Sequence, residues 1–374
     1  MFKKRLKIFE LLGFSVYIDW SWLILGAVVV WTLSQGFFPS SCPDLSGWTY
    51  LLMGLAGAAG LFFSLVFHEL SHSLFARKYG VDMSGITLFI FGGVAEMSEE
   101  PKTPKAEFVM GLMGPAASAF LAAFFAVFII ILGRFMPVPL TGVAEYLRDL
   151  NLVLCIFNLI PAFPLDGGRL LRAGLWKMKG DIFWATRIAS RIGYAFGWAL
   201  ILFGAFLFFS LEFFAGIWIL AAGWFLTRVA KASYENLVIK EALTGLKVSF
   251  FLREEEGVPS GATLQEFLEK FVYRQFYKLF PVIENGKLCG CVDLESVRKI
   301  QTEKRAFTSV NEIKKSCSPV NTIQSGAEAL DAVRRMGRKE DGRLLVVEDG
   351  WLKGAVNMKD IFCYIAAKRE IEGY

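Results

Sequence analysis

Six long apolar stretches constrain what this chain can fold into more than any other feature of its sequence. A helix needs about 20 mainly apolar residues to cross a bilayer. Hydrophobic residues make up 55% of the 374 residues and charged residues only 20%, which is too apolar for an ordinary soluble domain. We therefore predict a polytopic α-helical membrane protein with about six transmembrane helices, at residues 21–38, 49–74, 108–132, 143–163, 188–210 and 213–230.

The basic residues that flank these stretches indicate how the chain is oriented. Lys and Arg are concentrated in cytoplasmic loops. With the N-terminus inside, the outside loops hold only Arg134 and Arg148, and the inside flanks hold all other basic residues of the first 238. Both termini are therefore expected in the cytosol. The lipid bilayer is the expected partner, and a net charge of +5 without a large basic block gives no case for nucleic acid.

Between the second and third stretches lies a shorter apolar segment, residues 86–95, which contains the pair Gly92-Gly93. The segment is too short to span a membrane and is rich in strand-forming residues. We expect a membrane-associated β-hairpin that packs against the helices.

The charged C-terminal part, residues 239–374, contains an internal repeat. Residues 282–286 (VIENG) recur as residues 346–350 (VVEDG), and each copy reads as strand, tight turn, strand and helix. This α/β module resembles a pair of cystathionine-β-synthase (CBS) domains. The resemblance implies an adenine nucleotide between the repeats. Of the family's nucleotide-binding positions only Asp360 matches, so a homodimer formed through the pair, or a docking role, is the alternative. We predict two domains, 1–238 and 239–374.

The six cysteines show no framework spacing, and most of them fall in segments that we place in or facing the cytosol, where thiols stay reduced. We expect no disulfide. Cys289 and Cys291 alternate along a predicted strand, so packing explains them better than metal binding.

The chain contains only two histidines, and they are four residues apart in the run His68-Glu69-Leu70-Ser71-His72. Four residues make about one helical turn, so both imidazoles lie on one helix face, close enough to share a zinc ion. The motif continues a long apolar run, and ionisable residues at that depth indicate function. The alternative is a pair of packing or pore-lining histidines with Glu69 as a solvent-facing carboxylate, which is ordinary in a soluble helix but costly in this apolar run.

A catalytic zinc ion usually has three protein ligands and an open position. No third histidine exists, so the remaining ligand is a carboxylate or a thiolate. Asp82, Glu96, Cys155 and Asp166 are the candidates near the cytosolic end of the second stretch. Asp166 is favoured, because the surrounding residues 158–168 (NLIPAFPLDGG) contain two prolines and two glycines that break the fourth helix near the same face.

Together, these motifs and Gly114-Pro115 in the third stretch resemble the site-2 protease family of intramembrane zinc metalloproteases, in its CBS-bearing prokaryotic branch. The resemblance covers roughly residues 60–175. It implies one zinc ion per chain, bound by His68, His72 and Asp166, with Glu69 and Asn158 as catalytic residues. It also implies that the segment Phe91, Gly92, Gly93 and Val94 receives the substrate by strand addition.

The expected function is therefore regulated cleavage of transmembrane protein substrates within or near their membrane segments, in a prokaryotic-type cell membrane. The CBS pair is expected to modulate this activity. A CBS-regulated transporter or channel is the alternative, since broken helices and intramembrane acidic groups also occur in transporters. Against it, the membrane part has no visible inverted repeat, and two imidazoles with a carboxylate suit tetrahedral zinc.

Overall fold

Long apolar helices dominate the N-terminal part of the chain. The structure, a computed structural model, describes residues 5–97, 101–210, 213–275, 277–317, 321–337 and 342–372. Among these residues, four helical segments are long and apolar enough to cross a membrane, and they coincide with four of the six predicted spans. They are Trp20–Ser41, Gly47–Lys78, Pro104–Leu132 and Ile182–Phe209.

The other two predicted spans also fall on helices, α5 (Val138–Asn158) and α8 (Phe213–Leu243). Helix α5 carries Glu145, Arg148 and Asp149 in its middle, and the charged residues of α8 begin at Arg228, after its apolar first half. The total number of spans stays a prediction.

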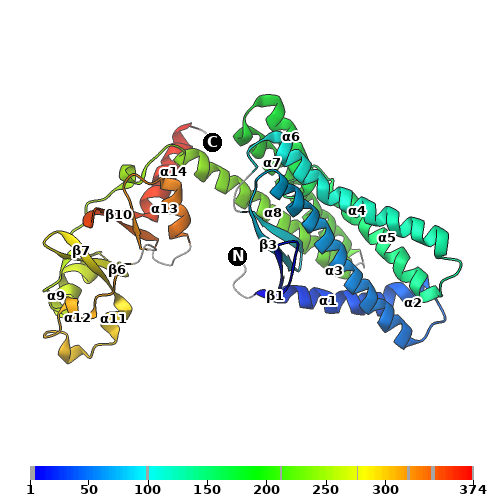
Figure 1. Cartoon of the computed structure of the whole chain (residues 1–374), viewed down its shortest axis with the longest axis horizontal. Helices are drawn as coiled ribbons and strands as arrows, with labels where there is room; N and C mark the ends of the chain where they lie inside the picture. The colour runs from blue at the N-terminus through cyan, green and yellow to red at the C-terminus, as the bar shows by residue number, and fades with distance from the viewer. Residues whose placement is uncertain are drawn as a thin grey trace. The chain divides into compact units, whose positions relative to one another are not determined.

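Helices α3 (Gly47–Lys78), α4 (Pro104–Leu132) and α5 run side by side and pack on one another (Figure 1). Each of the first two begins at a side-chain cap, because the Ser46 and Thr103 hydroxyls accept hydrogen bonds from the backbone three residues on. The remaining helices of this part are α1 (Trp20–Thr32), its continuation through a π-helical turn (Leu33–Phe37) into α2 (Phe38–Ser41), α6 (Asp166–Lys179) and α7 (Ile182–Phe209).

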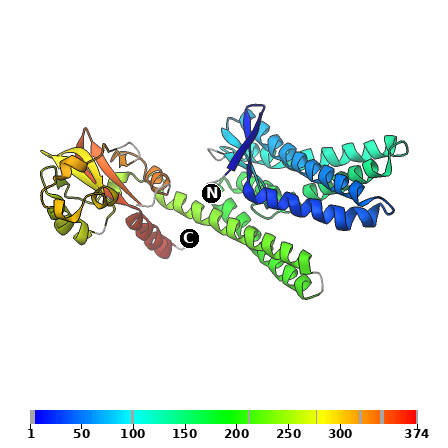
Figure 2. The same ribbon diagram turned by 90° about the horizontal axis from the view of Figure 1, so that it is seen from below.

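The predicted hairpin at residues 86–95 is confirmed, but it is half of a larger sheet that we did not predict. Strands β1 (Arg5–Leu11), β2 (Phe14–Asp19), β3 (Met83–Phe89) and β4 (Gly92–Met97) lie in that order, with β2 parallel to β3 and the other pairs antiparallel. Figure 2 shows this sheet beside the start of α1. Its buried residues Phe14, Val16, Ile86 and Leu88 pack on α3.

The break in the fourth predicted span is also present. Helix α5 ends at Asn158, a non-helical segment follows over residues 159–165, and α6 begins at Asp166. Pro161 and Pro164 lie in this segment and lack the N–H groups that a continuous helix needs.

The chain divides into two compact units, Met1–Tyr234 and Glu235–Tyr374. The second contains a six-stranded sheet in the order β5-β6-β7-β10-β9-β8, so the strands of one repeat mirror those of the other. The strands are β5 (Val258–Pro259), β6 (Leu279–Glu284), β7 (Lys287–Asp293), β8 (Thr322–Ile323), β9 (Arg343–Glu348) and β10 (Trp351–Asn357). The helices are α9 (Leu264–Phe267), α10 (Tyr273–Gln275), α11 (Leu294–Arg298), α12 (Val310–Ile313), α13 (Ala329–Met336) and α14 (Met358–Glu372).

The repeated sequence forms the two hairpins β6–β7 and β9–β10. Each hairpin turns through two residues with positive φ, Asn285-Gly286 and Asp349-Gly350. Two consecutive positive φ angles define the tight turn that joins antiparallel strands with the correct twist, and Asn-Gly and Asp-Gly adopt it most readily. The predicted repeat is therefore a repeat of structure as well as of sequence.

Our expectation that no disulfide forms is wrong. Cys291 on β7 is bonded to Cys317, with Cα atoms 5.4 Å apart. The backbone of Lys315 exchanges two hydrogen bonds of 2.8 Å with that of Cys291, which brings Cys317 alongside. The spacing of the cysteines carried no sign of this tertiary pairing. Cys42, Cys155, Cys289 and Cys363 are free thiols.

Candidate metal centre

The three predicted metal ligands come from two helices. His68 and His72 lie one turn apart on α3, and Asp166 is the first residue of α6. All three are buried, with 4%, 5% and 8% of their surface exposed. Burial of three such polar groups together is costly unless they share a partner, so their convergence itself indicates a site.

Close packing of glycines holds Asp166 in place. A Cβ atom on Gly167 would collide with the carbonyl oxygen of Leu159, and one on Gly168 would collide with the backbone of Phe163. Only glycine allows the first turn of α6 to rest directly on the segment that precedes it. The Asp-Gly-Gly run therefore fixes where the carboxylate lies.

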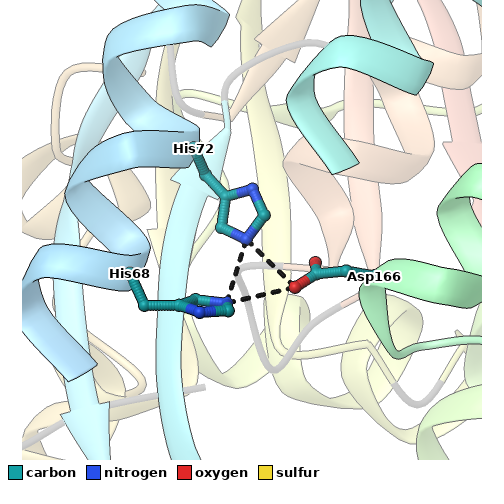
Figure 3. Close-up of side chains that lie close together, drawn as sticks. All are labelled: His68, His72 and Asp166. Atoms are coloured by element: carbon teal, nitrogen blue, oxygen red, sulfur yellow. Dashed lines mark hydrogen bonds and ion pairs between the residues drawn. The ribbon is translucent and has the colours of Figure 1, made fainter. Parts of the chain in front are cut away.

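The donor atoms of the three side chains converge on one point (Figure 3). The Oδ2 atom of Asp166 lies 3.1 Å from Nε2 of His68 and 3.1 Å from Nε2 of His72, and the two Nε2 atoms are 3.2 Å apart. Donors bound tetrahedrally to zinc at about 2.0–2.1 Å lie roughly 3.3 Å from one another. The spacing and the N,N,O donor set therefore fit a zinc ion with one coordination position left open.

Both histidines are oriented through their other ring nitrogen. Nδ1 of His72 lies 2.6 Å from the carbonyl oxygen of Met110, and Nδ1 of His68 lies 3.0 Å from the hydroxyl of Ser118. A carbonyl oxygen only accepts, so Nδ1 of His72 carries the proton and its Nε2 presents a lone pair. This support is the kind that metal-ligating histidines require.

Gly114 provides the space that the site occupies. A Cβ atom at this position of α4 would lie 2.5 Å from Nε2 of His68 and closer still to Nε2 of His72. The Gly-Pro pair stands out in the sequence only through the family resemblance, and its spacing does not reveal this steric role. Ser118 could have been found by its position one turn after Gly114, whereas the carbonyl of Met110 leaves no signal in the sequence.

Glu69 is half-buried on α3 and lies beside strand β4. A Cβ atom on Gly93 would lie 2.8 Å from Oε1 of Glu69, so the absence of a side chain there lets the strand pass close to the carboxylate. Glu69 does not belong to the group whose donor atoms converge. Glu69 therefore lies outside the set of side chains that could hold a metal ion together.

The other residues of the predicted substrate segment surround the turn of the hairpin. The ring of Phe91 stacks on that of Phe225 of α8, with centroids 4.5 Å apart. Gly92 and Gly93 begin β4, an edge strand whose only partner within the described sheet is β3. The backbone of Val94 lies in β4, and its side chain lies outside the described set.

The side chain of Asn158 is bonded within its own helix. It is the last residue of α5, and its amide donates a hydrogen bond of 3.0 Å to the carbonyl of Leu154 on the same helix. Of the alternative third ligands, neither exposed Asp82 nor Cys155 joins the convergent group, which among the described residues consists of the three already named. The side chain of Glu96 lies outside the described set.

In the C-terminal unit, Asp360 lies in the first turn of α14. Its carboxylate accepts a hydrogen bond of 3.4 Å from Asn357 and lies 3.5 Å from Nε of Arg253. The backbone of Arg253 is itself paired with Ala355 of β10. Asp360 is therefore already engaged with the segment that enters the module.

Comparison with known proteins agrees with this geometry. The chain matches peptidase family M50 over residues 56–146 and 136–204, and a CBS domain over residues 310–367. The M50 match contains both histidines and Asp166, and the CBS match contains Asp360. The CBS match covers the second repeat and leaves most of the first outside it.

Relatives match along most of the chain. The Mycobacterium tuberculosis protein named "Putative zinc metalloprotease Rip3" is 32% identical over 353 residues, 93% of this chain and 90% of that protein. A zinc metalloprotease of Methanocaldococcus jannaschii is 32% identical over 80% of this chain and 82% of its own length. The solved site-2 protease of M. jannaschii is 29% identical and covers 62% of this chain and 95% of its own, with a TM-score of 0.43.

These relatives favour the protease over the alternative of a transporter or channel. The family match includes His68, His72 and Asp166, and the 32% identity to the M. tuberculosis protein extends over 93% of the chain. The chain belongs to peptidase family M50, the site-2 protease family, and is a multi-pass membrane zinc metalloprotease with a C-terminal CBS domain.

Proposed function

We propose that this protease hydrolyses peptide bonds within or near transmembrane segments of other membrane proteins, using one zinc ion per chain held by His68, His72 and Asp166. One observation carries the proposal: three buried donor atoms from α3 and α6 converge at 3.1–3.2 Å inside a helical membrane domain. Two imidazole nitrogens and one carboxylate oxygen at this spacing match the donor set that a tetrahedral zinc ion takes.

The zinc ion, when bound, supplies polarisation of the substrate carbonyl and lowers the pKa of the attacking water. Glu69 takes the proton from that water and delivers it to the leaving amide nitrogen, so that one water molecule is added across the peptide bond. The position of Glu69 beside β4, apart from the three donors, supports this role.

Asn158 serves the same reaction by holding the substrate backbone or by donating a hydrogen bond to the developing oxyanion. Its amide donates to Leu154 in this structure, so the role includes a rotation of the side chain when substrate binds.

The substrate binds as an added strand along Phe91, Gly92, Gly93 and Val94, on the edge of β4 that has no partner within the described sheet. A transmembrane helix hides its carbonyl groups in its own hydrogen bonds, so it unwinds locally before it can be cut. Pairing with β4 gives the released groups new partners and passes them beside Glu69. Substrates with Gly or Pro near the cut are therefore preferred.

Replacement of Glu69 tests the assigned roles. Glu69→Gln removes the proton carrier but no ligand, so we expect cleavage of a co-expressed single-span substrate to stop while the zinc content of the purified protein stays near wild type. His68→Ala is expected to lose both zinc and cleavage. If Glu69→Gln loses as much zinc as His68→Ala, the assignment of Glu69 to proton transfer is wrong.

The third ligand is tested by two matched carboxylate variants. Asp166→Asn removes the charge that offsets the cation, so zinc affinity and cleavage are expected to fall. Asp82→Asn, at an exposed carboxylate, is expected to change neither. If Asp82→Asn lost zinc and cleavage while Asp166→Asn kept both, Asp166 would not be the third ligand.

The C-terminal module, which we take to begin at residue 239, regulates the protease and takes no part in the chemistry. Its sheet of two mirrored repeats and the CBS match at residues 310–367 support binding of an adenine nucleotide at Asp360, or formation of a homodimer. In a prokaryotic-type cell membrane, with both termini in the cytosol, such a module would report the state of the cytosol to the protease.

A further inference from the structure

A second pair of charged side chains is buried near the proposed zinc site, and neither member belongs to it. Glu107 lies in the first turn of α4, and Arg172 lies in α6. The Nε atom of Arg172 donates a hydrogen bond of 2.5 Å to Oε1 of Glu107, and its Nη2 atom contacts the same oxygen. The side chains of Glu107 and Arg172 are only 1% and 10% exposed. A buried ion pair is a poor source of stability, so its presence points to another role.

Each member of the pair lies close in sequence to a residue of the proposed zinc site or to a group that orients one. Glu107 precedes Met110 by three residues, and the carbonyl of Met110 orients His72. Arg172 follows Asp166 by six residues on the same short helix. The pair therefore joins the helix that orients one ligand to the helix that carries another.

The two helices touch at the ligand itself. A Cβ atom on Gly111 of α4 would lie 3.4 Å from the backbone oxygen of Asp166 and 3.3 Å from Cβ of Arg169. The guanidinium of Arg172 also lies over the ring of Phe163, 5.4 Å from its centroid, in the segment that leads into Asp166. Arg172 thus contacts both α4 and the segment before α6.

Asp166 needs such a support more than the two histidines do. His68 and His72 share one continuous helix, so the helix sets their relative positions. Asp166 comes from a separate helix of 14 residues that follows a break in the chain. Its distance from the imidazoles depends on how α6 is held against α4.

We propose that Glu107 and Arg172 form a positioning pair that sets the distance between the Asp166 carboxylate and the two imidazoles. The inference rests on the proposed zinc site and assigns no catalytic step to either residue. Removal of the pair should leave all three ligands in the chain but place one of them poorly, and metal affinity is sensitive to displacements of a few tenths of an ångström.

The test uses the full-length protein in detergent and three variants. Glu107→Leu combined with Arg172→Met removes both charges while keeping apolar volume, which usually leaves stability near wild type. Arg172→Lys keeps the charge but loses the fork geometry of the guanidinium. Arg148→Gln breaks the exposed Arg148–Asp149 pair of α5 and serves as the matched control.

Zinc affinity, the d–d absorption of the cobalt(II)-loaded protein and the melting temperature are measured for each. We expect the double variant to bind zinc about 10- to 100-fold more weakly, with an altered cobalt spectrum and a melting temperature close to wild type. Arg172→Lys should bind zinc more tightly than the double variant but more weakly than wild type. Arg148→Gln should bind zinc as tightly as wild type.

Different outcomes would overturn the inference and the function on which it rests. Wild-type affinity and an unchanged cobalt spectrum in the double variant would overturn the positioning role, and so would a loss of affinity that only follows a loss of folding. Failure of the wild-type protein to bind zinc or cobalt tightly would instead overturn the proposed zinc site.

Discussion

Replacement of Gly114 by alanine should weaken zinc binding strongly without unfolding the protein. The new Cβ atom would lie 2.5 Å from Nε2 of His68, whereas ordinary contacts of this kind begin near 3.4 Å. Relief of this overlap displaces the imidazole by about 0.9 Å, which is well outside the range of about ±0.2 Å within which metal–ligand distances are expected to fall. We expect zinc affinity to fall by at least about 100-fold, equivalent to about 2.7 kcal/mol.

The same substitution should not weaken the helix. Alanine in a helix interior is more favourable than glycine by roughly 0.5–1 kcal/mol. Gly174→Ala on α6 is the matched control, because a Cβ atom there meets nothing within 4 Å. Competition with a chromophoric chelator measures zinc affinity, and thermal unfolding of the zinc-free proteins measures stability. Zinc affinity within threefold of wild type in Gly114→Ala would refute the steric argument.

Three further predictions concern the C-terminal module. Cys291→Ser opens a loop of 26 residues and should lower the free energy of unfolding by about 3.5 kcal/mol in denaturant titrations, and equal stability of oxidised and reduced wild type would contradict this. Burial raises the pKa of Asp293, but hydrogen bonds from Lys315 and Ser296 outweigh it and leave the pKa below its ordinary value. The stability from this carboxylate is therefore present above about pH 4 and lost as the pH falls further, so Asp293→Asn should flatten the acid limb of the unfolding profile. Asp360→Ala should weaken ATP or AMP binding to the full-length protein in calorimetry, and unchanged micromolar binding would exclude Asp360.

The candidate zinc site could be anticipated because its residues carry local signals. The spacing of His68 and His72 follows from one helical turn, and Asp166 stands next to prolines and glycines that end a helix. The predicted orientation of the spans places these residues near the same face of the membrane, so their convergence could be expected. Asn158 was proposed only by resemblance, and its side chain is turned toward its own helix.

The features that escaped prediction depend on contacts between distant segments. Strand β2 lies in a short, mixed segment before the first span, and its partner β3 follows the second span. The bond between Cys291 and Cys317 depends on a backbone pairing at Lys315, and the support of His72 comes from a main-chain carbonyl. Periodicity and composition describe single segments, so none of these pairings was visible in them.

The parallel pairing of β2 with β3 also has a consequence for biogenesis. Val16 pairs with Ile86, and the chain between them contains two complete membrane helices. The edge strand β4 therefore gains its full sheet only after both helices have been inserted and have met. Asp166 emerges from the ribosome 94 residues after His72. If Asp166 is the third zinc ligand, as proposed, a nascent chain cannot complete the zinc site until α6 has followed both histidines out of the ribosome.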